Sequence, residues 1–466
     1  MIVMTELFGT NGIRGIVNKD MTSDFALQIG KAWGTYLQRK TDNPSVVIGT
    51  DARLSNTMLK YSITAGFLAT GCDVTDIGLV PTPSLQYTVR MKQFDSGVMI
   101  TASHNPPEFN GIKGIDADGT EFSKKTEEEI EGIYFSKCHK LVSWDAVGSY
   151  KTWDGANDLY LNGILSTVDI DAIKDHGFHV VLDCGNGAGS VVAPLLLKKL
   201  GCKVTELYCE PDGRFPGHPS EPVPENVKEL IRTVKEEQAD LGIAQDGDAD
   251  RAIFIDEKGA YVWGDQTLSL FANYHTKNKK NCIVVTPVTS STSLDDVVEK
   301  NNGIVVHTQV GSPIVARVMR EKNAVFGGEE NGGLIFPELQ YCRDSAMTLA
   351  KMLELLTVTE RSLSSLLSDI PQYIVVKKKI HCKDSIKQEV MRSIHDDVLN
   401  DDNVIRIDTT DGLKLYFKNG WVLMRPSGTE PLFRIYAEAK WSRDAEDLSK
   451  SFCTIVQDHI QKHERT

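Results

Sequence analysis

The chain has 466 residues, 41% of them hydrophobic and 25% charged, which predicts a water-soluble protein of three or four globular domains. Its formal net charge of −13 argues against a general nucleic-acid binder and against a partner at an anionic membrane surface. No stretch is long and apolar enough to cross a bilayer, the N-terminus lacks a signal-peptide pattern, and the nine cysteines form no C-x-x-C pair, so we expect a cytoplasmic protein with free thiols.

The first distinctive segment is residues 5–15, TELFGTNGIRG, which is rich in polar residues and glycines. Asn11-Gly12 is typical of a tight turn. Arg14 follows the turn, between two short apolar pieces. This arginine is either a surface side chain or an anion contact near the centre of the protein.

From there one pattern occurs three times. Apolar runs begin at residues 46, 180 and 283, and each leads through a helical stretch to a glycine and a second short strand. Short apolar runs that alternate with helices predict parallel βαβ units. Each copy then adds one helix and one strand, and that strand ends in a distinctive loop, at 101–107, 245–251 and 327–333. Three related α/β modules of this kind would bring the three loops to one central cleft.

The tail beyond Pro371 has a different pattern. We expect a helix around 384–399, strands around 404–407, 413–417 and 421–424, a strand from Phe433 and a last helix. This order indicates an α+β domain with antiparallel strands. The sequence therefore predicts four domains, at 1–152, 153–256, 257–370 and 371–466.

The loop of the first copy, Thr-Ala-Ser-His-Asn-Pro-Pro, contains Ser103. We expect this serine at the end of a strand, where open α/β sheets bind their ligands. The G-x-S-x-G elbow of acyl-transfer enzymes is absent, and a serine that only caps a neighbouring group is the alternative. Asn110-Gly111 predicts a turn that folds Lys113 back towards Ser103, where nearby cations would lower its pKa and suit it to acid–base work. A surface lysine is equally compatible with the sequence.

The loop of the second copy carries Asp246, Asp248 and Asp250 at two-residue spacing. In an extended loop this spacing points three carboxylates the same way, which is unfavourable unless a cation lies among them. The EF-hand is excluded because its sixth position requires glycine and is Arg251 here. Hard oxygen ligands with open positions favour Mg²⁺.

Two further loops carry polar groups suited to a sugar phosphate. Glu329, Glu330 and Asn331 lie between paired glycines, and their oxygens can accept hydrogen bonds from sugar hydroxyls. A carboxylate at Glu329 would also favour a 2-ammonium over a neutral 2-hydroxyl group. Residues 425–431, RPSGTEP, join a cation, two hydroxyls and a glycine, a combination that can hold a phosphate monoester. Plain turns are the alternative for both loops.

Four motifs occur in one order: T-A-S-H-N-P, D-G-D-A-D-R, G-E-E-N-G-G and R-P-S-G-T-E-P. Together they resemble the α-D-phosphohexomutases nearly from end to end, and L-F-G-T-N-G-I-R-G is most similar to the phosphoglucosamine mutase branch, especially its archaeal-type members. The resemblance implies three related mixed-sheet α/β domains and a C-terminal α+β domain, similar to the TATA-binding protein, around a central cleft. It also implies an isomerase that works through a phosphoserine and a hexose 1,6-bisphosphate on a hexose or hexosamine phosphate.

The resemblance also assigns roles to individual residues. It implies a phosphoserine at Ser103 and Mg²⁺ held by that phosphate and by Asp246, Asp248 and Asp250. The substrate-binding residues that it implies are Glu329 and Asn331 for the sugar, Arg425, Ser427, Gly428 and Thr429 for the distal phosphate, and Arg251, which falls where relatives place a supporting catalytic residue. The supporting catalytic residues that it implies are Lys113, His104 and Arg14.

Two departures from the family pattern leave the sugar open. Asn331 stands where many relatives have serine, and Ser312 stands where some glucose and mannose mutases have histidine. A phosphomannomutase/phosphoglucomutase is therefore the first alternative to a phosphoglucosamine mutase. A Mg²⁺-dependent sugar-phosphate phosphatase and a non-catalytic sugar-phosphate sensor are alternatives of other classes. The resemblance leaves a homodimer open.

Overall fold

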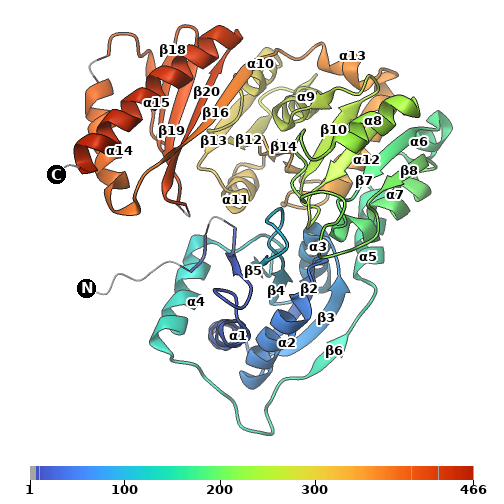
Figure 1. The fold of residues 1–466 in the computed structure, drawn as a ribbon. Helices are drawn as coiled ribbons and strands as arrows, with labels where there is room; N and C mark the ends of the chain where they lie inside the picture. Colours follow the sequence, from blue (N-terminus) through green and yellow to red (C-terminus); the bar gives the residue numbers. More distant parts are fainter. Residues whose placement is uncertain (1–6, 10, 400, 429, 465–466) are drawn as a thin grey trace.

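The computed structural model describes residues 7–9, 11–399, 401–428 and 430–464. Four β-sheets follow one another along the chain, and Figure 1 shows them arranged around the middle of the molecule, from the first sheet at the bottom to the fourth at the upper left. Within the described residues, none of the helices has the length and apolar character needed to cross a membrane.

The first sheet has six strands in the order β1-β5-β4-β2-β3-β6. Its central strand β4 is buried along its whole length, as expected for parallel strands covered by helices on both faces. The strands are β1 (Ile13–Ile16), β2 (Ser45–Thr50), β3 (Asp73–Leu79), β4 (Ser96–Ile100), β5 (Phe109–Asp116) and β6 (Tyr150–Thr152). The helices of this part are α1 (Ser23–Leu37), α2 (Asn56–Ala69), α3 (Thr82–Lys92) and α4 (Lys124–Ser136).

The second and third sheets repeat the arrangement of the first. In each, the first strand lies between two parallel neighbours, and the next strand adds antiparallel at the outer side: β9-β7-β8 followed by β10, and β14-β12-β13 followed by β15, like β4-β2-β3 followed by β5. The threefold repeat predicted from sequence is therefore confirmed, and the loops at 101–107, 245–251 and 327–333 each connect the third strand of a copy to its antiparallel neighbour.

The elements of these two sheets are as follows. The second sheet contains β7 (His179–Asp183), β8 (Lys203–Leu207), β9 (Leu241–Gln245), β10 (Ala252–Asp256) and β11 (Tyr261–Val262), with α5 (Ala156–Leu165), α6 (Ile170–His176), η1 (Ala188–Val191), α7 (Ala193–Lys199) and α8 (Lys228–Glu236). The third contains β12 (Ile283–Pro287), β13 (Ile304–Thr308), β14 (Phe326–Gly328) and β15 (Leu334–Ile335), with α9 (Gly264–Thr276), α10 (Thr292–Lys300), α11 (Ser312–Lys322), α12 (Ser345–Thr359) and α13 (Leu363–Leu367).

Helix α12 joins the second and third units into one packed body. Its buried residues Met347, Leu349 and Leu353 belong to a single hydrophobic cluster that also contains Leu196 of α7 and Phe326 of β14. A shared core of this kind holds two sheets rigidly together, because interiors are close-packed and resist sliding.

The fourth sheet is antiparallel, in the order β16-β20-β19-β18-β17. It docks on the third unit through the Glu438 carboxylate, which accepts a hydrogen bond from the Thr292 amide at the start of α10 at 2.9 Å. Within the sheet, Trp421 Nε1 donates to the same carboxylate at 2.7 Å. Lys414 Nζ also donates to the Val288 carbonyl at 2.7 Å and lies 3.8 Å from the centre of the Trp421 ring. The elements are β16 (Ile374–His381), β17 (Arg406–Asp408), β18 (Leu413–Phe417), β19 (Gly420–Pro426), β20 (Leu432–Ala439), η2 (Asp384–Ile386), α14 (Lys387–Val398) and α15 (Ser442–Glu464).

Two details differ from the sequence prediction. Strand β11 lies beyond the predicted boundary at residue 256 but pairs with β10, so the second sheet extends to Val262. Strand β16 was not predicted, because three consecutive lysines interrupt its apolar residues; it lies at the edge of its sheet, where lysines are common. The domain boundaries themselves stay a prediction.

Candidate active site

Ser103 lies just beyond the end of β4 and is fully buried. Its backbone is in the left-handed region, with a φ of 51°, which is uncommon for a residue with a side chain. The Ser103 amide donates to Thr101 Oγ1 at 2.8 Å, and the Ser103 hydroxyl donates to Asp246 Oδ2 at 2.7 Å. The serine loop of the first unit therefore touches the acidic loop of the second.

The side chain of Arg53 binds the backbone of the serine loop. Its guanidinium donates to the backbone carbonyls of Ser103 at 2.8 Å, Asn105 at 2.6 Å, Pro106 at 2.6 Å and Phe109 at 2.8 Å. The same side chain pairs with Asp51, at 3.1 Å, and is fully buried. Hydrogen bonds from a charged donor to several carbonyls are strong. These four hydrogen bonds of Arg53, which we call the arginine cage, can therefore stabilise the positive φ of the serine.

The arginine cage also spans two units. The ring of Phe215, from the second unit, lies 5.1 Å from the Arg53 guanidinium. Gly213 packs so closely on residues 52–54 that a Cβ there would lie 2.4 Å from the Ala52 carbonyl oxygen. Sequence analysis missed Arg53; the only signal was its place two residues after the aspartate that ends the first apolar run.

The three aspartates lie together in the β9–β10 loop, all buried, with one oxygen of each within 4.8 Å of the others. Asp248 Oδ2 accepts from Thr82 Oγ1 at 2.6 Å and from Lys113 Nζ at 2.8 Å. The second oxygens of Asp248 and Asp250 have no hydrogen-bond partner within the part of the chain that the structure describes. Buried carboxylate oxygens with free lone pairs suit a hard cation, so these residues fit a magnesium ion.

The electrostatics of the three aspartates favour a cation as well. Burial and the neighbouring carboxylates of Asp250 and Asp248 raise the pKa of Asp246. Although burial opposes it, the ammonium of Lys113 holds the pKa of Asp248 well below its usual range. The cluster thus has one carboxyl that resists ionisation, which is the expected effect of crowding like charges, and a cation among the carboxylates would offset their repulsion.

Lys113 lies on β5, with its ammonium 2.8 Å from Asp248, 3.4 Å from Asp250 and 3.9 Å from Glu121. Burial lowers its pKa, but these carboxylates outweigh burial and raise it. The lowered pKa expected from sequence is therefore wrong, because the groups that face the lysine are mostly acidic. The turn expected at Asn110-Gly111 is also wrong, since both residues lie within β5.

Three further predicted residues surround the serine. Arg14 donates to the Asn105 side-chain oxygen at 2.7 Å and to the Ala102 carbonyl at 3.3 Å. His104 Nδ1 lies 3.3 Å from Ser103 Oγ, and burial, together with the charges of Arg251 and Arg14, lowers the pKa of His104 to about 2. Arg251 Nε lies 3.6 Å from Asp250 Oδ1 and 3.9 Å from Asp246 Oδ2.

The third loop is tied to the acidic loop by Arg343. Its guanidinium donates to Glu329 Oε2 at 2.6 Å and also to Asp250 Oδ2. A Cβ at Gly333 would lie 2.2 Å from Arg343 Cδ, so the glycine leaves room for this side chain. Asn331 Oδ1 accepts from the Gly333 amide at 3.1 Å. Arg343 was not singled out from sequence, because its partners lie far from it along the chain.

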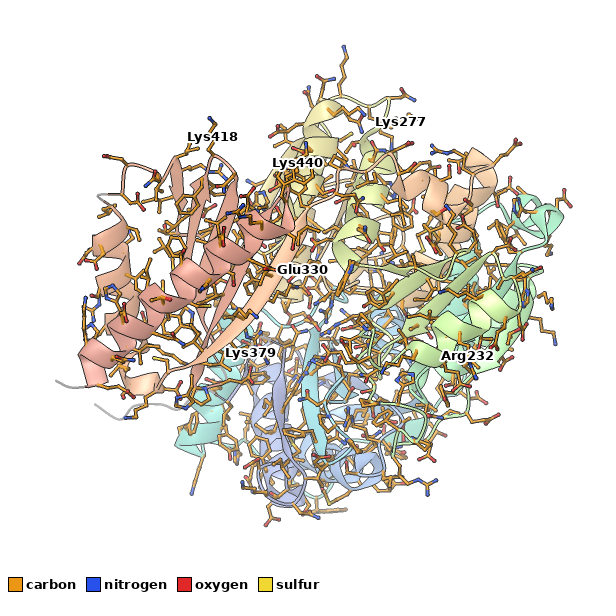
Figure 2. The ribbon with its side chains drawn as sticks, turned by 45° about the horizontal axis from the view of Figure 1, so that its top comes forward. Arg232, Lys277, Glu330, Lys379, Lys418 and Lys440 are labelled. Atoms are coloured by element: carbon orange, nitrogen blue, oxygen red, sulfur yellow. The ribbon has the colours of Figure 1, made fainter. Side chains whose placement is uncertain are left out.

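Glu330, between these residues, faces the fourth unit. It accepts from Thr289 Oγ1 at 2.9 Å and lies 3.9 Å from Lys377 Nζ on β16. Figure 2 shows Glu330 near the middle of the molecule, whereas Lys418 and Lys440 lie at the outer end of the fourth sheet.

The tail loop lies at the end of β19. Arg425 pairs with Asp411 at 2.8 Å, and Asp411 also accepts from the Val310 amide of the third unit at 2.9 Å. Ser427 Oγ accepts from the Glu430 amide at 3.1 Å, and a Cβ at Gly428 would meet open space. Thr429 lies outside the described residues.

Two cations that the sequence did not single out lie in one row with Arg425, across the neighbouring strands β20 and β16. Lys379 on β16 stands directly opposite Arg434 on β20, and Arg434 stands directly opposite Arg425 on β19. Directly opposed residues of antiparallel strands share a face of the sheet, so the three cations form a row beside the tail loop.

Comparison with known proteins matches the whole arrangement. Four models of the phosphoglucomutase/phosphomannomutase family match in sequence order: α/β/α domain I at residues 5–140, domain II at 158–259, domain III at 263–373 and the C-terminal domain at 378–454. The phosphoglucomutase/phosphomannomutase of Thermococcus kodakarensis is 44% identical over 98% of this chain and 100% of its own. The phosphoglucosamine/phosphogalactosamine mutase of Sulfurisphaera tokodaii is 40% identical over 97% of this chain and 100% of its own.

A solved structure agrees with the sequence matches. The phosphoglucomutase/phosphomannomutase family protein of Burkholderia thailandensis superposes with a TM-score of 0.88 at 27% identity, covering 98% of each chain. The chain therefore belongs to the phosphoglucomutase/phosphomannomutase family, the α-D-phosphohexomutases, which are isomerases that transfer a phosphoryl group within a hexose phosphate.

Proposed function

We propose that the protein is a phosphoglucosamine mutase, which interconverts glucosamine 6-phosphate and glucosamine 1-phosphate. The observation that carries the chemistry is the 2.7 Å contact of the Ser103 hydroxyl with Asp246, inside a buried cluster of three aspartates and Lys113. The amino sugar is supported by the similarity to the Sulfurisphaera tokodaii enzyme, whose name states glucosamine and galactosamine phosphates.

In this proposal, Ser103 carries a phosphoryl group on Oγ and gives it to the free hydroxyl of the hexosamine monophosphate. The bond between phosphorus and Ser103 Oγ breaks as the new ester bond to the sugar oxygen forms, and the proton that the sugar hydroxyl loses balances the proton that the freed serine oxygen takes up. The resulting 1,6-bisphosphate then reorients end for end within the site, and Ser103 takes the other phosphoryl group back. A Mg²⁺ held by Asp246, Asp248 and Asp250 would supply positive charge to the transferring group.

The surrounding residues have distinct tasks in this scheme. Lys113, Arg14 and Arg251 offer positive charge around the transferring group, which is the main protein contribution in phosphoryl transfer. His104 stays neutral because its pKa is lowered to about 2, and its Nδ1, 3.3 Å from Ser103 Oγ, can hydrogen-bond to the serine and orient it.

The remaining predicted residues hold the rest of the substrate. Glu329, oriented by Arg343 at 2.6 Å, and Asn331 would accept hydrogen bonds from sugar hydroxyls. The distal phosphate would lie at the tail loop, with Arg425, Ser427, Gly428 and Thr429.

A second candidate is a phosphoglucomutase/phosphomannomutase. It is favoured by the 44% identity to the Thermococcus kodakarensis enzyme that carries this name. Both candidates use the same chemistry and differ only in the group at C2 of the sugar.

One experiment tests the reaction and a second tests the sugar. NMR of glucosamine 6-phosphate with the enzyme and Mg²⁺ should show glucosamine 1-phosphate; free phosphate would indicate a phosphatase, and an unchanged spectrum would indicate a sensor. Initial rates with glucosamine, glucose and mannose 6-phosphates should then give the highest kcat/KM for glucosamine phosphate. A higher value for glucose or mannose phosphate would refute the proposed sugar and leave the mutase chemistry intact.

A further inference from the structure

A carboxylate that no part of the mutase scheme uses lies beside the acidic loop. Glu121 follows β5, and its side chain is 11% exposed. It lines a cavity together with Asp250, Ser312 and Arg343, and it also lines a neighbouring cavity with Lys113. A group of the substrate that enters next to Asp250 would therefore meet this carboxylate.

Glu121 carries a charge that its neighbours only partly balance. Within the part of the chain that the structure describes, the one ammonium or guanidinium within 4 Å of its carboxylate is Lys113 Nζ, at 3.9 Å, and that ammonium lies much closer to Asp248, at 2.8 Å. Glu329 differs, because Arg343 donates to its carboxylate at 2.6 Å. Of these two carboxylates, Glu121 has the greater capacity to receive another cation.

The position of the Glu121 side chain is fixed by a neutral donor. Ser312 Oγ donates to Glu121 Oε2 at 2.6 Å, which leaves Oε1 directed towards Lys113. The hydroxyl orients the carboxylate without neutralising it. Since carboxylate oxygens accept several hydrogen bonds, one more donor can be added.

We propose that Glu121, oriented by Ser312, accepts a hydrogen bond from the 2-ammonium group of a hexosamine phosphate and so sets the preference for an amino sugar over a neutral sugar. This inference rests on the proposed function and names the residue that would give it its substrate. A charge-assisted hydrogen bond is roughly twice as strong as a neutral one. A 2-hydroxyl group offers only the neutral bond, so the carboxylate discriminates between the two sugars.

A purely structural role is the competing explanation. The turn that carries Glu121 also docks on α11, where Arg317 donates to the Glu121 carbonyl at 2.5 Å and to Asp116 at 2.7 Å. These contacts use the backbone and a different side chain. Glu121→Gln keeps them, and the amide oxygen of glutamine can still accept from Ser312, so this substitution removes the charge alone.

The test compares kcat/KM for glucosamine 6-phosphate and glucose 6-phosphate in the wild type, in Glu121→Gln and in Asp118→Asn. The ratio of the two values should fall by about tenfold or more in Glu121→Gln, given the strength of charge-assisted bonds. Asp118→Asn is the matched control, because Asp118 belongs to the same docking turn and pairs with Arg320. It should change the two values by the same factor.

Each outcome separates this inference from the proposed function. A wild type that prefers glucose phosphate refutes the proposed sugar, and the inference with it. A wild type that prefers glucosamine phosphate, with an unchanged ratio in Glu121→Gln, overturns the inference alone. If a thermal melt shows that Glu121→Gln does not fold, Glu121→Asp replaces it; the shorter side chain keeps the charge but withdraws it, so the ratio must still fall, and an unchanged ratio overturns the inference.

Discussion

Replacing Ser103 by alanine and by glycine separates the chemical role of the hydroxyl from its structural role. Both variants lack the proposed nucleophile, so both should lose turnover by more than about 10³-fold, as expected when a covalent nucleophile is removed. The two should differ in stability. The φ of residue 103 is 51°, a conformation that glycine adopts without steric cost and alanine does not.

The size of the stability effect follows from one hydrogen bond and from the backbone conformation of residue 103. Removing the hydroxyl deprives buried Asp246 Oδ2 of a donor at 2.7 Å, which costs about 1–3 kcal/mol. Glycine should recover roughly 0.5–1 kcal/mol of this relative to alanine, because alanine at positive φ is strained. We therefore expect the order wild type, Ser103→Gly, Ser103→Ala, from most to least stable.

The assay is turnover of glucosamine 6-phosphate beside thermal melts of the three unphosphorylated proteins. Activity near that of the wild type in either variant would refute the assignment of Ser103 as the nucleophile. Equal melting temperatures for the two variants, or a less stable glycine variant, would refute the argument from the backbone conformation.

The remaining predictions concern the metal, the distal phosphate and the fourth unit. Chelation should stop turnover and Mg²⁺ should restore it. Ca²⁺ should bind but support a lower turnover rate, because it is larger and takes more ligands. Full activity in chelator, or equal rates with Ca²⁺ and Mg²⁺, would contradict the site at Asp246, Asp248 and Asp250. Arg425→Ala should lower kcat/KM in both directions by about ten- to a hundredfold, the loss of one charge-assisted contact worth roughly 1.5–3 kcal/mol; the exposed Arg443→Ala is the control, and an unchanged kcat/KM in Arg425→Ala would exclude the tail loop as the phosphate site. Burial lowers the pKa of Lys414 to about 8, below that of an unfolded lysine. Between these two pKa values the unfolded chain binds more protons than the folded one, so this residue makes the free energy of unfolding rise with pH. The melting temperature of Lys414→Met minus that of the wild type should therefore decrease from pH 7.5 to pH 10. A constant difference would show that the charge of Lys414 does not destabilise the folded protein.

Residues that act through a local pattern were predictable from the sequence. Ser103 and the three aspartates follow buried strands, and the end of a strand fixes where its loop lies. The repeat of strand order was predictable for the same reason. By contrast, Arg53 acts on backbone carbonyls, which leave no mark in the sequence, and Arg343 acts on carboxylates from two other loops.

Lys113 illustrates the limit of local reasoning. Its place near the serine was expected from a turn, but β5 runs straight through Asn110-Gly111 and reaches the site as a strand. The direction of its pKa shift depends on Asp248 and Asp250, which belong to the second unit. Only the docking of the two units determines that acidic rather than basic groups surround the lysine.

The arginine cage has a consequence for any attempt to divide the chain. Phe215 and Gly213 cover Arg53 from the second unit, and Asp246 of that unit receives the Ser103 hydroxyl. A fragment that ends after β6 would keep its sheet but expose the arginine to water, which would compete for the carbonyls of the serine loop. We expect such a fragment to fold with a disordered serine loop, and to recover the ordered loop when the fragment that carries the second unit is added.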